Sequence, residues 1–210
     1  MKHFFDYDGH MNQVLTKLMY VVAANLLFLI CCIPVVTAGA SAAAMYKVLQ
    51  RFQAGDEPDI IKTFFRAFRE NFKESTIVWT ILLLISLTLG VNYYLLFHMS
   101  GWGIELIRVF FNLILMVWLA FCIYFFPTAA YFENTLSGHA EFAFRLAIGH
   151  LPRTILMILI QTIPMLLLVY LAQYTSGAVL LLLCCGFSLP AYCSVKILSG
   201  IFQRYGEQSV

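Results

Sequence analysis

Long apolar stretches without any charged residue recur along the chain. Asp, Glu, Lys and Arg are absent from 18–36, 75–97, 109–132 and 154–195. A helix that crosses the hydrocarbon core of a membrane needs about 20 apolar residues. The last stretch is therefore long enough for two spans, and its polar segment AQYTSG is expected to be a tight turn between them. The pattern predicts transmembrane helices at about 15–36, 76–97, 107–126, 154–171 and 178–198.

A different pattern occupies residues 58–73, where apolar and charged positions follow the period of an α-helix. Asp56 or Glu57 can cap this helix, and Pro58 suits its first turn. One face collects the apolar residues Ile60, Ile61, Phe64, Phe65, Phe68 and Phe72, and the opposite side carries Lys62, Arg66, Arg69, Glu70 and Lys73. Phenylalanines opposite basic residues are typical of a helix lying in the membrane interface. By pattern, docking of this face on a partner protein or on the chain's own spans is an equal alternative.

Composition supports the same fold class. Hydrophobic residues make up 61% of the 210 residues and charged residues only 11%, with a mean hydropathy of +0.83. Soluble domains average about half and about a quarter. We predict an all-α, polytopic membrane protein, with residues 1–210 as a single integral membrane domain in the lipid bilayer. No nucleic-acid partner is expected.

The distribution of basic residues predicts the orientation. Most of the 13 Lys and Arg residues lie in the 37–75 loop, in the 127–153 loop and after the fifth predicted span. Loops rich in Lys and Arg stay on the cytoplasmic side. The expected location is a bacterial cytoplasmic membrane, with the N-terminus outside and the C-terminus in the cytoplasm.

The stretch CCIPVVTAGAS follows the first predicted span. Pro34 is expected to end that helix, and the small residues 38–44 allow a following helix to pack closely. We expect similar joints at Pro127 and Pro190. Residues 38–40 (AGA) also resemble a signal-peptidase site, but the preceding apolar run exceeds the usual length of a signal sequence and acidic residues precede it. The membrane joint is the favoured interpretation.

No motif for catalysis, a cofactor or a metal is present. The six cysteines form no C-x-x-C, and H-E-x-x-H, G-x-S-x-G and P-loop motifs are absent. We interpret the cysteines as packing residues, although a cross-helix pair between 31–32 and 184–185 stays open. The polar residues within the spans are neutral, and interhelical hydrogen bonds are favoured over a substrate pathway: Asn25, Asn92, Asn112, Gln161 and Thr162. The sequence predicts a protein that is not an enzyme.

A faint internal repeat is also visible. CCGFSLPAYCSVK near the C-terminus resembles CCIPVV…YK near the N-terminus, and residues 141–159 resemble residues 63–82. Such a repeat suggests two similar hairpins plus a closing span, a plan found in many membrane folds.

Three segments together resemble the YesL family of bacterial membrane proteins, a family of unknown function. They are FFDYDG (4–9), NLLFLICCIPVVTAGAS (25–41) and FFRAFRENFKESTIVW (64–79). The resemblance extends over the whole chain and is strongest over residues 4–79. It implies an inner-membrane protein that accompanies carbohydrate uptake genes, and it marks Pro34, Thr37, Gly39, Phe64, Phe68, Asn71 and Phe72 as family positions, most simply architectural ones.

Three functional hypotheses follow from these observations. The favoured one is a non-enzymatic accessory protein of a carbohydrate ABC importer, with Phe64, Phe65, Phe68, Phe72, Arg66 and Arg69 contacting the permease or the membrane. The second is a small transporter or channel, acting alone or as an oligomer. The third, a membrane enzyme acting on lipid or glycan, lacks the nucleophile or metal ligands that it needs.

Overall fold

The computed structural model describes residues 10–99, 101–132, 136–149 and 151–206, so the motif at 4–9 lies outside the described residues. Within these ranges the chain is helical and contains no strand. The elements are α1 (His10–Cys31), the 3-10 helix η2 (Val35–Thr37), α2 (Ala38–Gln53), α3 (Ile60–Phe97), α4 (Trp102–Tyr131), α5 (Leu136–Gly149), α6 (Leu151–Ala172), α7 (Ser176–Cys185) and α8 (Ser188–Gly206). The predicted all-α fold is confirmed.

In the described part of the chain, four helices are long and apolar enough to cross a membrane. They are α1 from Gln13, α3, α4 and α6, while α7 and α8 supply a fifth span only as a pair bent by 42°. The predicted polytopic membrane protein with about five spans is therefore confirmed. The turn predicted at AQYTSG is also present, between the end of α6 and the start of α7.

Two of the predicted spans are not continuous helices. The predicted span at about 15–36 is helical only as far as Cys31, and the expected end of this helix at Pro34 is confirmed. Pro34 has no backbone N–H and disfavours helical geometry in the preceding residue, so the helix ends before it. The predicted span at 178–198 corresponds to the pair α7 and α8, which is bent by 42° at a break between Cys185 and Ser188. This break precedes Pro190, which sits in the first turn of α8, where a missing N–H costs no helical hydrogen bond.

The amphipathic segment 58–73 and the predicted span 76–97 are one helix, α3, of 38 residues. The prediction of a separate interfacial helix was wrong, because neither proline nor glycine interrupts residues 60–89. The start also differs. Asp59 is the N-cap, and its carboxylate accepts a hydrogen bond from the backbone N–H of Lys62 at 3.2 Å.

The span predicted at 107–126 extends in both directions to form α4, and Pro127 lies inside it. The predicted joint at Pro127 was therefore wrong. The buried amide of Gln50 donates to the Pro127 carbonyl at 2.9 Å, which ties α2 to this turn of α4. The carbonyl that the missing N–H of Pro127 leaves without a helical donor is that of Ile123, so the Gln50 bond stabilises the α2–α4 contact and does not replace the missing one.

Helix α2 lies at the centre of the molecule and packs against α1, α3, α4 and α8. Its small residues Ala40, Ala43 and Ala44 are fully buried. At Gly39 a Cβ atom would lie 2.5 Å from both the Ser75 carbonyl oxygen and the Trp79 Cβ, so only glycine permits this approach to α3. The predicted close packing of residues 38–44 is confirmed.

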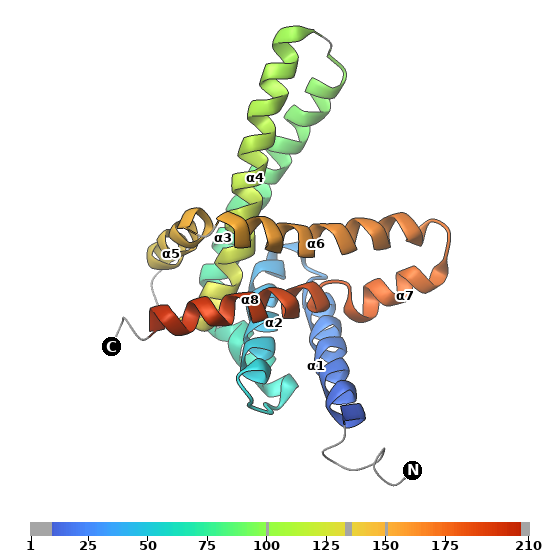
Figure 1. Cartoon of the computed structure of the whole chain (residues 1–210), viewed down its shortest axis with the longest axis vertical. Coiled ribbons are helices and arrows are strands. Elements are labelled where there is room, and N and C mark those ends of the chain that lie inside the picture. The colour runs from blue at the N-terminus through green and yellow to red at the C-terminus, as the bar shows by residue number, and fades with distance from the viewer. Residues whose placement is uncertain (1–9, 100, 133–135, 150, 207–210) are drawn as a thin grey trace.

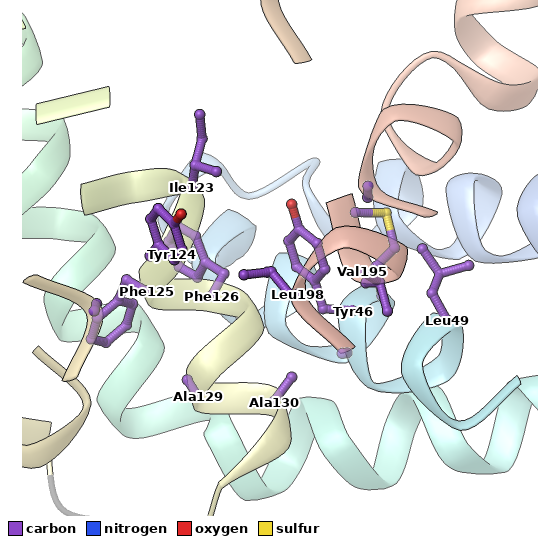
Figure 2. Packing of buried hydrophobic residues seen from close by; sticks show 14 of the residues in the cluster. Tyr46, Leu49, Ile123, Tyr124, Phe125, Phe126, Ala129, Ala130, Val195 and Leu198 are labelled. Atoms are coloured by element: carbon purple, nitrogen blue, oxygen red, sulfur yellow. The ribbon is translucent and has the colours of Figure 1, made fainter. Parts of the chain in front are cut away.

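Side chains from α2, α4 and α8 meet in the core. Figure 2 shows Tyr46 and Leu49 of α2 beside Val195 and Leu198 of α8, with the α4 turns from 123 to 130 in the same cluster. These contacts join segments that are far apart in the sequence. The core therefore holds α8 against the N-terminal half of the chain.

Two apolar hairpins project from this core in different directions, α3–α4 upward and α6–α7 to the right (Figure 1). Their outer turns expose large apolar side chains, among them Leu84, Tyr94, Phe97, Trp102, Phe110, Leu166, Tyr170 and Leu180. Soluble proteins do not expose apolar patches of this size. The bilayer is the environment in which such surfaces are stable.

Candidate functional site

The phenylalanine face of α3 divides into a buried part and an exposed part. Phe64 is fully buried, and Ile60 and Phe68 pack against the core cluster. The Phe64 and Phe68 rings are stacked, with centroids 6.4 Å apart. Part of the face therefore docks on the chain's own helices, which was one of the alternatives left open by the pattern.

The exposed part of the face forms a hollow of about 440 Å³ lined by Phe65, Phe68, Arg69 and Phe72, called the α3 hollow below. Phe65 is 49% exposed and Phe72 is 42% exposed. The Phe68 and Phe72 rings lie 5.5 Å apart at its base. The structure thus brings together four of the six residues that the sequence selected for this surface.

Charge around the α3 hollow is basic. Arg66 and Arg69 are exposed, and neither has a carboxylate partner among the described residues. Asp59, at the start of the helix, is bound instead by the backbone N–H and the ammonium group of Lys62. These contacts hold the pKa of the Asp59 carboxyl below its usual value. The arginines are therefore free to bind an anionic group.

The family positions outside the face have local structural roles. The hydroxyl of Thr37 lies 2.6 Å from the Cys31 carbonyl and 2.7 Å from that of Pro34, so it closes the bend between α1 and α2. Gly39 permits the α2–α3 contact. The Asn71 amide donates to the Ala67 carbonyl within α3, at 3.0 Å. Thr37, Gly39 and Asn71 therefore stabilise the bend, the α2–α3 contact and helix α3 itself, and none of them lines the α3 hollow.

Asn25, which the sequence predicts only as a residue that forms an interhelical hydrogen bond, connects three helices. Its side chain is fully buried and bridges α1 to the break between α7 and α8. The amide donates to the Leu183 carbonyl at 2.7 Å, and the amide oxygen accepts from the backbone N–H groups of Phe187 and Ser188, each at 3.0 Å. A single asparagine thus binds the end of one helix and the start of the next.

The predicted interhelical hydrogen bonds hold for some polar residues and not for others. Gln161 of α6 donates to the Tyr46 hydroxyl of α2 at 2.7 Å, so it joins two helices as expected. Asn92 instead donates to the Thr88 carbonyl of its own helix. Asn92 lies near the end of α3, in the outer part of the α3–α4 hairpin, and is partly buried.

The cysteines carry no disulfide in the described residues, where all six are free thiols. No group of His, Cys, Asp and Glu among these residues is placed to hold a metal ion.

Comparison with known proteins gives a partial match. Residues 21–93 match the family described as "Protein of unknown function, DUF624". The chain is also 22% identical over 163 residues to "Uncharacterized protein YteU" of Bacillus subtilis (strain 168), covering 77% of this chain and 70% of that protein. No solved structure matches. The family match contains Asn25, the α1–α2 bend, Gly39 and the α3 hollow, and it names no function.

Proposed function

We propose that this chain is a YesL-type accessory protein of the bacterial cytoplasmic membrane, without catalytic activity of its own. Its partner is the permease of a carbohydrate ABC importer, which binds the α3 hollow from the cytoplasmic side. The partner class rests on the YesL resemblance, and the orientation rests on the positive-inside rule.

The observation that carries the proposal is the α3 hollow itself. Aromatic residues and arginine are enriched among the residues that dominate binding energy in protein interfaces. Phe65, Phe72 and Arg69 are exposed, although other phenylalanines of the same face are buried. Arg66 and Arg69 add two charges that have no carboxylate partner in the described part of the chain, which favours a partner surface that carries carboxylates.

The experiment is co-purification of the tagged protein with sugar permeases in mild detergent, with uptake measured in parallel. Phe65→Ser combined with Phe72→Ser should abolish co-purification and lower sugar uptake, while expression stays normal. Phe97→Ser is the matched control, because Phe97 is 72% exposed at the other end of the same helix. Normal uptake in a clean deletion strain would overturn the accessory role. Unchanged co-purification of the double variant would overturn the role of the hollow.

The broken helices favour transport as a second candidate function. The α1–α2 and α7–α8 breaks are neighbours, with the Phe28 and Phe187 rings 5.2 Å apart. Discontinuous helices form substrate and ion sites in many transporters. Uptake of a labelled sugar by liposomes that contain only this protein would establish this candidate, and absence of uptake beside a working importer control would dismiss it.

A further inference from the structure

Helices α1 and α2 form an antiparallel hairpin, because contacts pair the two helices in opposite order. Near the start of α2, the Ser41 hydroxyl donates to the Phe28 carbonyl at 3.0 Å. Near its end, the Phe52 ring stacks on Tyr20, with the ring centroids 4.1 Å apart. A later residue of α2 thus meets an earlier residue of α1. The chain therefore returns, along α2, toward the end at which α1 begins.

The end to which α2 returns is charged. The Tyr20 hydroxyl donates to the Pro58 carbonyl at 2.9 Å, so the middle of α1 lies beside the loop 54–59. This loop is flanked by two exposed ion pairs, Arg51–Asp56 and Asp59–Lys62. Charged side chains are costly in the hydrocarbon core. The loop, and Tyr20 beside it, therefore lie at the membrane surface or in water.

The residues that precede Tyr20 in this chain do not supply another crossing. A crossing helix needs about 20 predominantly apolar residues. Residues 1–19 are interrupted by Lys2, Asp6, Asp8 and Lys17, so no uncharged run of that length lies among them. The start of α1 therefore stays on the side of the loop 54–59.

The tip of the hairpin, residues 33–36, lies beside the middle of α3. The indole N–H of Trp79 donates to the Val35 carbonyl at 2.7 Å. From Trp79 to its end at Phe97, α3 continues for about 27 Å. The hydrocarbon core is about 30 Å thick, so this outer part of α3 covers most of a crossing by itself. Although α1 is long and apolar enough to cross, its hairpin therefore ends well short of the α3–α4 turn.

The tip suits the apolar part of a leaflet. Ile33, Val35 and Val36 are exposed, Ile33 by 79%. The Thr37 hydroxyl binds carbonyls of the bend, in addition to the bond from Trp79. Irregular backbone at membrane depth is tolerated where protein groups satisfy it.

We propose that α1 and α2 form a re-entrant hairpin, which enters the membrane from the side of the loop 54–59, turns at residues 33–36 and leaves on the same side. The exposed tip contacts the acyl chains of the near leaflet. The start of α1 then faces the same compartment as the α3 hollow. The expectation of an external N-terminus counted α1 as a crossing and did not include the return along α2.

The distribution of basic residues supports this arrangement. With α1 counted as a crossing, Lys2, Lys17 and Arg108 lie outside. The returning hairpin moves Lys2 and Lys17 to the basic side and leaves, of the 13 Lys and Arg residues, Arg108 outside. Basic residues near membrane helices stay in the cytoplasm, so the shared side is the cytoplasm.

Cysteine accessibility tests which segments share a side. In a chain whose six cysteines are replaced by alanine, Gln13→Cys, Glu57→Cys and Trp102→Cys are each treated with a membrane-impermeant maleimide in spheroplasts and in inside-out vesicles. All three positions are exposed, at the start of α1, in the loop 54–59 and at the α3–α4 turn. Gln13→Cys and Glu57→Cys should be labelled in inside-out vesicles, and Trp102→Cys in spheroplasts. Labelling of Gln13→Cys in the same preparation as Trp102→Cys overturns the proposal.

The tip gives a second readout. Ile33→Cys should not react in the preparation that labels Trp102→Cys, because the tip does not reach that side. Reaction there overturns the re-entrant hairpin.

A third readout keeps the native cysteines, in case the cysteine-free chain does not fold. An epitope tag is placed before Met1 in one protein and between Gly55 and Asp56 in another, and protease is added to each preparation. Both tags should be removed in the same preparation, and removal in opposite preparations overturns the proposal. No partner is needed for these readouts. Labelling of both Gln13→Cys and Glu57→Cys in spheroplasts would support the hairpin and contradict the cytoplasmic position of the α3 hollow.

Discussion

The two helix breaks of this protein begin with the same dipeptide, Cys-Cys, but they are closed in different ways. At the α1–α2 break Thr37 makes local bonds to carbonyls three and six residues earlier, and the Trp79 indole of α3 donates one remote bond to the Val35 carbonyl at 2.7 Å. At the α7–α8 break the bonds that bridge the two helices come from Asn25, more than 150 residues away along the chain. The first bend is closed partly by its own segment, whereas the second depends on Asn25 of α1.

The largest effect is expected at the break that depends on a remote residue. Asn25→Leu keeps the number and branching of the side-chain heavy atoms but leaves two backbone N–H groups and a carbonyl without their partner. A buried donor or acceptor that has lost its hydrogen-bond partner costs about 1–3 kcal/mol. We therefore expect a loss of at least about 2 kcal/mol in the free energy of unfolding. Denaturation in mixed micelles measures it.

Asn92→Leu is the control for this variant, because the Asn92 amide bonds only to its own helix. It should change the free energy of unfolding by less than about 0.5 kcal/mol. Equal effects of the two substitutions would show that the α7–α8 break does not depend on α1.

A smaller effect is expected at the local break. Thr37→Val removes a hydroxyl shared by the Cys31 and Pro34 carbonyls, and the expected loss is about 1 kcal/mol. Thr37→Ser keeps the hydroxyl and should stay close to the original stability in the same assay. A loss as large as that of Asn25→Leu would contradict the contrast between the breaks.

The smallest effect concerns two serines, one beside each break, that both donate to carbonyls of α1. Ser41 binds the Phe28 carbonyl at 3.0 Å, and Ser188 binds that of Val21 at 2.7 Å. Each Ser→Ala variant should cost about 0.5 kcal/mol, since each carbonyl keeps its helical bond. The carbonyls lie about 10 Å apart along α1, so the double variant should show an additive loss. A clear departure from additivity would mean that the breaks are coupled.

The same contrast explains how much of the fold could be predicted. Span-length apolar stretches, the turn after α6 and the close packing at residues 38–44 follow from local composition, and the sequence predicts them correctly. The joint expected at Pro190 is present a few residues earlier, between Cys185 and Ser188. The residue that closes it could not be predicted from the local sequence, because Asn25 lies on α1. The joint expected at Pro127 was wrong because α4 continues through it, in a buried turn on which α2 packs through the bond from Gln50 to the Pro127 carbonyl.

The sequence predicts that the phenylalanines of α3 share one face of the helix, but it does not predict which of them are buried and which are exposed. The helical period places Phe64 and Phe65 on the same arc, yet Phe64 is fully buried and Phe65 is half exposed. That division depends on which neighbours reach α3, and the pattern of one helix does not contain them.

The continuity of α3 has a mechanical consequence. Its 38 residues correspond to about 57 Å of helix, with the α3 hollow near one end and the hairpin tip at the other. Because one hydrogen-bonded helix carries both features, the spacing between the α3 hollow and the hairpin tip along the helix axis is set by a single element and not by a loop.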